Sequence, residues 1–190
     1  MHSGGLQIIA PGLIEQTWSE AEVLGSAVWL WMHSSSHRHT SLDALPALLL
    51  PAIKHRQFIL AAEAGRPVFY LSWANLNAQT EQQFIQRHQI HMKDAEWNSG
   101  DRMWIFDWVA PFGHTMTMGG MLFCQLFANR CWRALSHRGE ERGLKIKNFS
   151  GDAVLPEEAD LWFSLRPLAG TFATAPSRKS NKTTAARSAA

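Results

Sequence analysis

The chain has 190 residues, and 46% of them are apolar, which is enough to bury the core of one domain. Lys and Arg together number 18 against 16 Asp and Glu, but four of the bases lie in residues 171–190, which hold no acid. The rest of the chain therefore carries 14 basic and 16 acidic residues, a balance that excludes a domain-wide nucleic-acid surface. The longest apolar run, VLGSAVWLWM, is about half a membrane span, and the N-terminus lacks a leader pattern, so we expect no membrane segment and no export.

Helices are expected in the first third of the chain. Apolar residues recur at helical spacing over residues 19–32, and Ser19 is suited to cap the first turn. A second helix is expected near residues 41–53. Pro46 and Pro51 interrupt it, because proline has no backbone N–H to donate.

The middle of the chain predicts strands. Residues 57–76 read as an antiparallel hairpin that turns at Gly65-Arg66-Pro67, and residues 101–110, DRMWIFDWVA, read as a strand buried on both faces. The remaining expected elements are helices at 80–88, 115–130 and 156–163 and strands at 133–138 and 143–149.

This order of elements indicates an α+β domain with a mainly antiparallel sheet. We assign it residues 19–170, with residues 1–18 as an N-terminal extension and residues 171–190 as a basic, disordered tail.

Asp107 stands inside the buried strand and needs a partner, because an isolated buried carboxylate is costly. Arg102 on the same strand would make a structural ion pair, whereas a histidine from elsewhere would make a catalytic dyad. His37 has two matching interpretations, as a histidine satisfied at a helix end or as a general base. A metal site built from His33, His37 and His39 is a third possibility, but no HExxH motif or carboxylate ligand accompanies them.

Four blocks in order carry a family resemblance: EVLGSAVWLWMHSSSHR, LPAIKHRQFIL, RPVFYLSWANL and WNSGDRMWIFDWVAPFG. Together they resemble the toxin-activating lysine acyltransferases, bacterial cytoplasmic enzymes that fatty-acylate RTX-type protoxins. The resemblance spans about residues 22–113 and implies a fold similar to the GNAT acyltransferases. Two cysteines in apolar surroundings fit a reducing compartment of this kind.

The resemblance implies that an acyl group passes from acyl-carrier protein to the ε-amino group of an internal protoxin lysine, with no cofactor and no metal. His37 and Asp107 match the family's essential histidine and aspartate. Ser34 and Tyr70 match positions with supporting roles. His37 would act as the base in a direct transfer or would first form an acyl-imidazole, and we prefer the direct route.

A docking patch for the donor should be basic, because acyl-carrier protein is acidic and carries a phosphopantetheine phosphate. We expect Arg38, Lys54 and Arg56, with His55 between the last two, to form it. The chain lacks the Q/R-x-x-G-x-G/A loop of enzymes that use acetyl-CoA, since RGEERG at 138–143 has the wrong spacing, and this favours a carrier-protein donor.

Three alternatives stay open. The scaffold could serve as a non-catalytic partner-binding protein, the three histidines could bind a metal, or the enzyme could modify a protein other than an RTX toxin. The family also implies a homodimer.

Overall fold

The structure, a computed structural model, describes residues 2–3, 5–86, 92–136 and 145–170. Seven strands form one sheet in the order of the sequence. They are β1 (His2–Ser3), β2 (Leu6–Ile9), β3 (Phe58–Glu63), β4 (Arg66–Leu76), β5 (Arg102–Val109), β6 (Cys131–Leu135) and β7 (Ile146–Ser150). Neighbouring strands are antiparallel except β5 and β6, which are parallel and pair only at Trp104 with Arg133 and at Ile105 with Ala134. The predicted α+β class with a mainly antiparallel sheet is confirmed.

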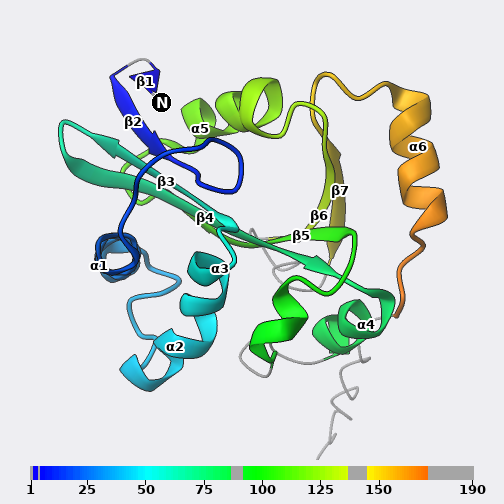
Figure 1. The fold of residues 1–190 in the computed structure, drawn as a ribbon, viewed down its shortest axis with the longest axis horizontal. Coiled ribbons are helices and arrows are strands. Elements are labelled where there is room, and N and C mark those ends of the chain that lie inside the picture. The colour runs from blue at the N-terminus through cyan, green and yellow to red at the C-terminus, as the bar shows by residue number, and fades with distance from the viewer. Residues whose placement is uncertain (1, 4, 87–91, 137–144, 171–190) are drawn as a thin grey trace, which may run out of the picture.

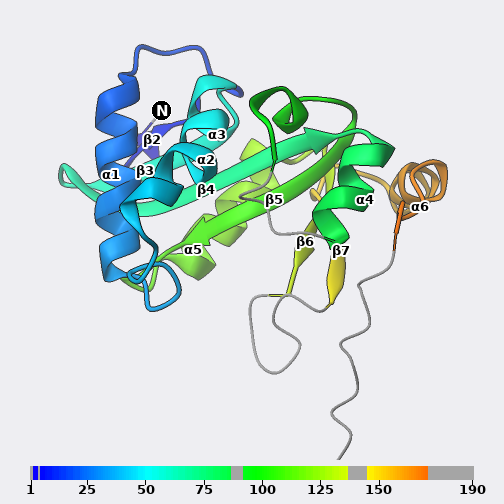
Figure 2. The ribbon, with the colours of Figure 1, turned by 90° about the horizontal axis from the view of Figure 1, so that it is seen from below.

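Helices cover both faces of the sheet (Figures 1 and 2). One face carries α1 (Glu20–His33), η1 (Leu42–Ala44), α2 (Leu45–Leu48), α3 (Leu50–Lys54), α4 (Ala78–Gln86) and η3 (Asp94–Trp97). The other face carries α5 (Thr115–Met121) and the π-helical turn η4 (Leu122–Leu126), while α6 (Pro156–Leu165) stands beside the β7 edge. No helix in the described part of the chain is long and apolar enough to cross a bilayer.

The helices begin and end as the local chemistry requires. Ser19 caps α1, its hydroxyl accepting a hydrogen bond from the backbone N–H of Glu22, so the predicted start is confirmed. The proline-containing stretch forms three short helices instead of one. Pro46 and Pro51 lie in the first turns of α2 and α3, where a missing N–H costs nothing.

The hairpin turn lies one residue earlier than expected. Glu63 pairs with Arg66, so the two turn residues are Ala64 and Gly65, with φ of 48° and 80°. Two left-handed residues match the twist of the flanking strands. Pro67 belongs to β4 and not to the turn.

An irregularity in β5 decides which way its polar residue faces. Ser72 of β4 pairs with Asp107 and Trp73 pairs with Ile105, which leaves Phe106 as an extra residue in β5. Ile105 packs in the core under α5, whereas Phe106 packs in the core under the α4 side. In a regular strand Asp107 would lie on the same face of the sheet as Ile105, because side chains two residues apart share a face. The bulge instead turns Asp107 to the opposite face, which carries α1.

Arg102 does not pair with Asp107, the partner considered from the sequence. Its guanidinium donates to Glu81 of α4 at 2.8 Å, and the Glu81 side chain is 0% exposed. Arg133 and the indole of Trp104 also donate to Glu81. Arg102 and Asp107 are five residues apart on an extended strand, about 16 Å, which exceeds the reach of an arginine side chain.

The Glu81 cluster also anchors the segment after α6. The backbone N–H of Ala169 donates to Glu81, Arg102 donates to the carbonyl of Pro167, and Arg133 donates to the carbonyl of Arg166. A carboxylate buried with two guanidinium groups therefore fastens residues 166–169 to the sheet.

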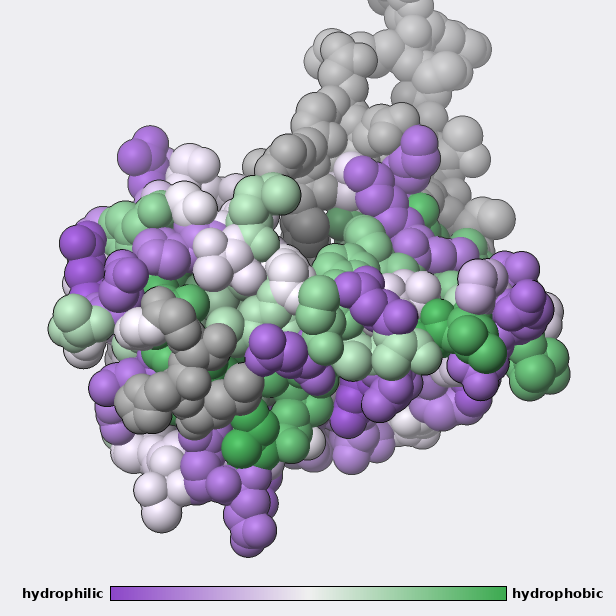
Figure 3. All heavy atoms as spheres, turned by 90° about the horizontal axis from the view of Figure 1, so that it is seen from above, coloured by the Kyte–Doolittle hydropathy of each residue, from purple (hydrophilic) through white to green (hydrophobic). Residues whose placement is uncertain are grey.

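The stretch assigned as an N-terminal extension, residues 1–18, supplies β1 and β2, and Leu6 and Ile8 of β2 are buried. The assigned basic tail, residues 171–190, lies outside the described residues. Figure 3, which views the molecule from above, shows hydrophobic groups exposed between hydrophilic ones. α6 has no buried residue, and its Leu161 and Leu165 are among the exposed apolar side chains.

Candidate active site

The end of α1 leads directly into the candidate site. Ser34 adopts an extended conformation as the C-cap, and its carbonyl accepts hydrogen bonds from the N–H groups of His37 and Arg38. The carbonyl of His37 accepts another from Thr40. These consecutive turns fold the serine-histidine stretch back against the helix end and direct the His37 side chain toward the sheet.

His37 and Asp107 form a dyad. Nε2 of His37 lies 2.9 Å from Oδ1 of Asp107, and the two side chains are 22% and 6% exposed. One partner comes from the loop after α1 and the other from β5, 70 positions further along the chain. The imidazole is thus open to solvent on one side and held by a buried carboxylate on the other.

Ser34 occupies the second ring nitrogen, since its Oγ lies 2.8 Å from Nδ1 of His37. An ionised carboxylate can only accept, so the hydrogen of the neutral ring belongs on Nε2, facing Asp107. Nδ1 then carries the lone pair, and the Ser34 hydroxyl donates to it. Hydroxyl, imidazole and carboxylate are joined in a row, which is the arrangement of triads that move a proton during acyl transfer.

Trp31 completes the site, and sequence reasoning missed it. Its indole Nε1 donates to Oδ2 of Asp107 at 3.1 Å, and its ring stacks on His37 with centroids 4.9 Å apart. Trp31 therefore fixes both members of the dyad. It stands six residues before His37 in a run of apolar residues, where nothing distinguishes it from core tryptophans.

Tyr70 lies behind the dyad and not at its open side. Its side chain is 0% exposed and belongs to the core cluster under α1, and its ring stacks near Phe58. Burial raises the pKa of Tyr70 well above its ordinary value of 10.0, the charge of Asp107 adds to the rise, and Ser72 opposes it. The Tyr70 hydroxyl therefore stays protonated at neutral pH.

An alkaline titration tests this placement. The folded state keeps the Tyr70 proton where the unfolded chain loses it, so we expect the free energy of unfolding to fall as the pH rises above about 10. Tyr70→Phe should remove this part of the fall. Tyr70 is the only tyrosine of the chain, so tyrosinate absorbance reports on it alone. A titration midpoint near pH 10 in the folded protein would contradict the buried placement.

The neighbouring histidines make separate contacts. Nδ1 of His33 bonds to the carbonyl of Trp29, one helical turn earlier, and His39 accepts from the Nε of Arg38. Across the described ranges, no group of three His, Cys, Asp or Glu side chains is placed to hold a metal ion. In the described residues, His33, His37 and His39 are therefore not placed to bind the same metal ion.

The expected basic patch is divided between two places. Arg38 is exposed on the loop after α1, next to His37. Lys54 and Arg56 are exposed at the end of α3, close to the start of α1, where Trp18 contacts Phe58. The 14 residues of α1, about 21 Å long, lie between the two places. Figure 2 shows α3 near one end of α1 and the loop after α1 at the other. The structure does not bring these three residues into one patch.

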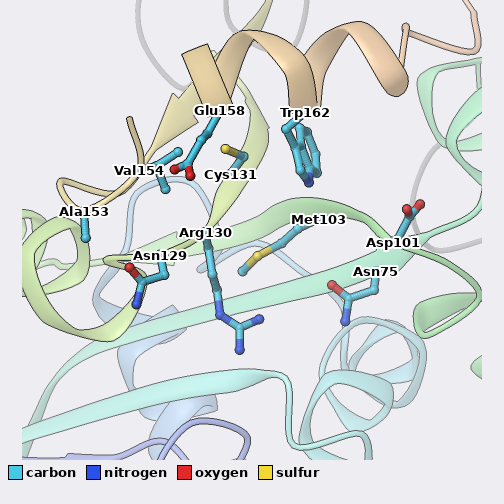
Figure 4. A pocket seen from close by; sticks show the side chains of 10 residues that line it. All are labelled: Asn75, Asp101, Met103, Asn129, Arg130, Cys131, Ala153, Val154, Glu158 and Trp162. Atoms are coloured by element: carbon cyan, nitrogen blue, oxygen red, sulfur yellow. The ribbon is translucent and has the colours of Figure 1, made fainter. Parts of the chain in front are cut away.

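Two of the hollows in the described part of the structure are lined by residues outside the dyad. A cavity of about 650 Å³ lies under α5, between that helix and strands β5, β6 and β7. A smaller cleft of about 330 Å³ lies beside α6, where Glu158 and Trp162 project toward Arg130 (Figure 4). None of the residues expected at the site lines either hollow.

A Ser–His–Asp row on an α+β scaffold defines an enzyme of the acyl-transfer class. The model of the RTX toxin acyltransferase family matches residues 16–150, and the chain belongs to that family. It is an acyltransferase.

Characterised relatives agree with this assignment. The leukotoxin-activating lysine-acyltransferase of Mannheimia haemolytica serotype T3 is 41% identical over 130 residues, 68% of this chain and 77% of the relative. The corresponding enzyme of Aggregatibacter actinomycetemcomitans is 42% identical over 134 residues, 70% and 78% of the two chains. The protein-lysine myristoyltransferase of Kingella kingae is 36% identical over 131 residues, 69% and 77%.

Among solved structures, the loading GNATL domain of CurA from Lyngbya majuscula overlaps 84% of this chain and 83% of its own, with a TM-score of 0.42 and 10% identity. The fold class assigned above comes from the strand order of the chain itself.

Proposed function

We propose that this enzyme moves a fatty acyl group from acyl-carrier protein to the ε-amino group of an internal lysine in an RTX-type protoxin. The observation that carries the proposal is His37, whose two ring nitrogens are engaged by Ser34 and Asp107. The printed names of the relatives describe lysine acyltransferases that activate toxins, and one of them a lysine myristoyltransferase.

The chemical need is removal of a proton. A lysine with an ordinary pKa of about 10.4 is nearly all ammonium at neutral pH, so it cannot attack a thioester until a base takes a proton. Nδ1 of His37 is the basic nitrogen of the row, and it accepts that proton directly or through the Ser34 hydroxyl. Asp107 and Trp31 hold the ring while it carries the positive charge.

The remaining steps balance without another reactant. The free amine attacks the thioester carbonyl, and the attacking nitrogen releases a second proton to solvent. The C–S bond breaks as the tetrahedral intermediate collapses, and the thiol of the carrier arm leaves with the proton that His37 took from the lysine. The products are an amide on lysine and a free carrier thiol.

The geometry favours His37 as a base over His37 as a nucleophile. An acyl-imidazole needs a ring nitrogen free to attack a carbonyl, but Nε2 is bonded to Asp107 and Nδ1 to Ser34. A proton acceptor needs only to exchange one hydrogen-bond donor for another. We therefore favour direct transfer.

Docking of the acidic carrier protein is assigned to Arg38 first, because it is the basic residue beside His37. We expect Arg38→Glu to raise the KM for acyl-carrier protein roughly three- to fivefold at low salt and to flatten its salt dependence. The Lys54→Glu, Arg56→Glu double variant, at the far end of α1, should raise KM less. Initial rates measured at several salt concentrations give the KM of each variant and distinguish the two docking sites. A larger effect of the double variant would move the docking site to the end of α3.

Intact-mass analysis tests the proposed function. An RTX-type protoxin is co-expressed with this chain and acyl-carrier protein, and the protoxin mass is compared with that from cells lacking the enzyme. A fatty-acyl increment that peptide mapping places on lysine supports the proposal. If the folded protoxin shows no increment but another protein is acylated, the acyltransferase activity stands and the RTX-type acceptor is wrong.

The same proposal includes the bacterial cytoplasm as the site of action and a homodimer as the assembly. The non-catalytic binding protein considered from the sequence is not retained, because the chain belongs to an acyltransferase family.

A further inference from the structure

We propose that the apolar cavity under α5 holds the fatty chain of the donor and that Gly119 sets the longest chain it accepts. The inference rests on the proposed function, since it names the acyl subsite of that reaction. The cavity is lined by residues of β5, β6, β7, α5 and η4, among them Ile105, Trp108, Met116, Gly119, Phe123 and Trp132.

The size and chemistry of the cavity suit a hydrocarbon chain. Its volume of about 650 Å³ lies within the range of small-molecule sites, roughly 300–1,000 Å³. Phe123, Trp132 and Phe149 contact one another in its wall, Trp132 and Phe149 being stacked with centroids 5.8 Å apart. A chain of methylene groups makes no hydrogen bonds, so aromatic and aliphatic walls favour it over a polar ligand.

The cavity and the dyad lie on the two faces of one strand. Asp107 faces His37, while the next residue of β5, Trp108, lines the cavity. β5 pairs with β6 only as far as Ile105, so among the described residues no strand borders that edge of β5 beside Asp107 and Trp108. A linear donor that crosses this edge can present its thioester to His37 and its tail to the cavity.

Trp108 offers a polar group beside this route. Its indole Nε1 is buried and has no hydrogen-bond partner in the described part of the chain. An unpaired N–H is costly to bury, and a substrate carbonyl can reach this one only after the Trp108 ring turns toward the cavity that it lines.

Two glycines keep the wall of the cavity open. Gly119 and Gly120 are consecutive residues of α5, separated by Met121 from the π-helical turn η4. Glycine makes a helix less stable than alanine would. No contact requires glycine here, because a Cβ built on either residue meets nothing within 4 Å. Larger side chains would therefore fit the backbone here, and they would occupy the space of the ligand.

Chain-length profiles test the assignment. Transfer rates are measured for octanoyl, dodecanoyl, myristoyl and palmitoyl carrier protein with the wild type and with Gly119→Leu. Each methylene kept out of the cavity should cost about fourfold in kcat/KM. We therefore expect the variant to lose about tenfold or more with palmitoyl donor and to keep its octanoyl rate within about twofold.

Gly25→Leu is the matched control, because Gly25 is also a helical glycine with nothing within 4 Å of a built Cβ, and it lies on α1 away from the cavity. It should keep the wild-type profile. Equal losses for all donors in a folded Gly119→Leu protein, or an unchanged profile, would overturn the assignment.

A second measurement does not depend on turnover or on the variant. Wild-type enzyme is irradiated with carrier protein bearing a palmitoyl chain with a terminal diazirine, and the crosslinks are mapped by mass spectrometry. We expect them on Met116, Phe123 or Trp132, and crosslinks confined to other residues would overturn the proposal. Crosslinks in the cavity without transfer to any acceptor would reject the proposed function alone. Transfer with crosslinks elsewhere would reject the cavity alone.

Discussion

Replacing His37 with alanine should lower acyl transfer by about 10²–10⁴-fold, the usual contribution of a general base. Two of the hydrogen bonds that order the site end on this ring, one from Ser34 and one to Asp107. Without the ring, the lysine has no acceptor for its proton, and Ser34 has no partner that would accept its own. The KM for the carrier protein should change little, because the loss falls on the chemical step. Single-turnover rates of protoxin acylation measure the effect.

His39→Ala is the control for this variant. His39 is a second exposed-loop histidine two residues away, it bonds only to Arg38 in the structure, and its loss should change the rate by no more than about twofold. Equal activity of His37→Ala and the wild type would remove His37 from the mechanism. Equal losses in the two histidine variants would point to a disturbed loop instead of a lost base.

Replacing Asp107 with asparagine should be nearly as damaging, with a loss of up to about 10⁴-fold that does not exceed that of His37→Ala, although the side chain keeps its size. The amide can still accept the hydrogen bond from Trp31. Its NH₂ group, however, faces Nε2 of His37 and donates where the carboxylate accepted. The ring must then carry its hydrogen on Nδ1, which is the nitrogen that has to receive the lysine proton. Rates and melting temperatures are measured together, and the melting temperature should change far less than the rate.

A double variant separates this mechanism from simple damage. His37→Ala combined with Asp107→Asn should be no slower than His37→Ala alone, because the aspartate acts only through the histidine. Losses that multiply would show that Asp107 has an independent role. Asp160→Asn, on the exposed α6, serves as the matched control and should behave as the wild type.

Several of the elements that local sequence periodicity predicts are found, whereas β1 and β2 were not predicted and the helix expected near residues 41–53 is three short ones. The capped helix α1, the β3–β4 hairpin and the buried strand β5 all follow from short-range patterns, since capping, turn chemistry and side-chain alternation act over a few residues. His37 and Asp107 could also be named as candidates in advance, one from the serine-histidine stretch and one from a charge in an apolar strand, but only the family resemblance favoured a catalytic role over a structural one.

The sequence could not assign their partners. From the residues alone, Asp107 could pair with Arg102 or with a histidine from elsewhere in the chain, and structural pairing is favoured. The choice depends on a bulge at Phe106 and on a helix end that reaches β5 from 70 positions away. Arg38, Lys54 and Arg56 looked like one patch because they are close in the chain, yet the length of α1 separates them.

By itself, therefore, the sequence determined most of the central secondary structure, the family and, through the family resemblance, the two residues expected to carry the acid–base chemistry. The tertiary structure alone decided that Asp107 faces His37, that Trp31 holds both, and that the hydrophobic space lies behind the same strand. The physical reason is range. Propensity and periodicity are properties of neighbours in the chain, whereas a dyad and a cavity are made by strand register and helix packing between distant segments.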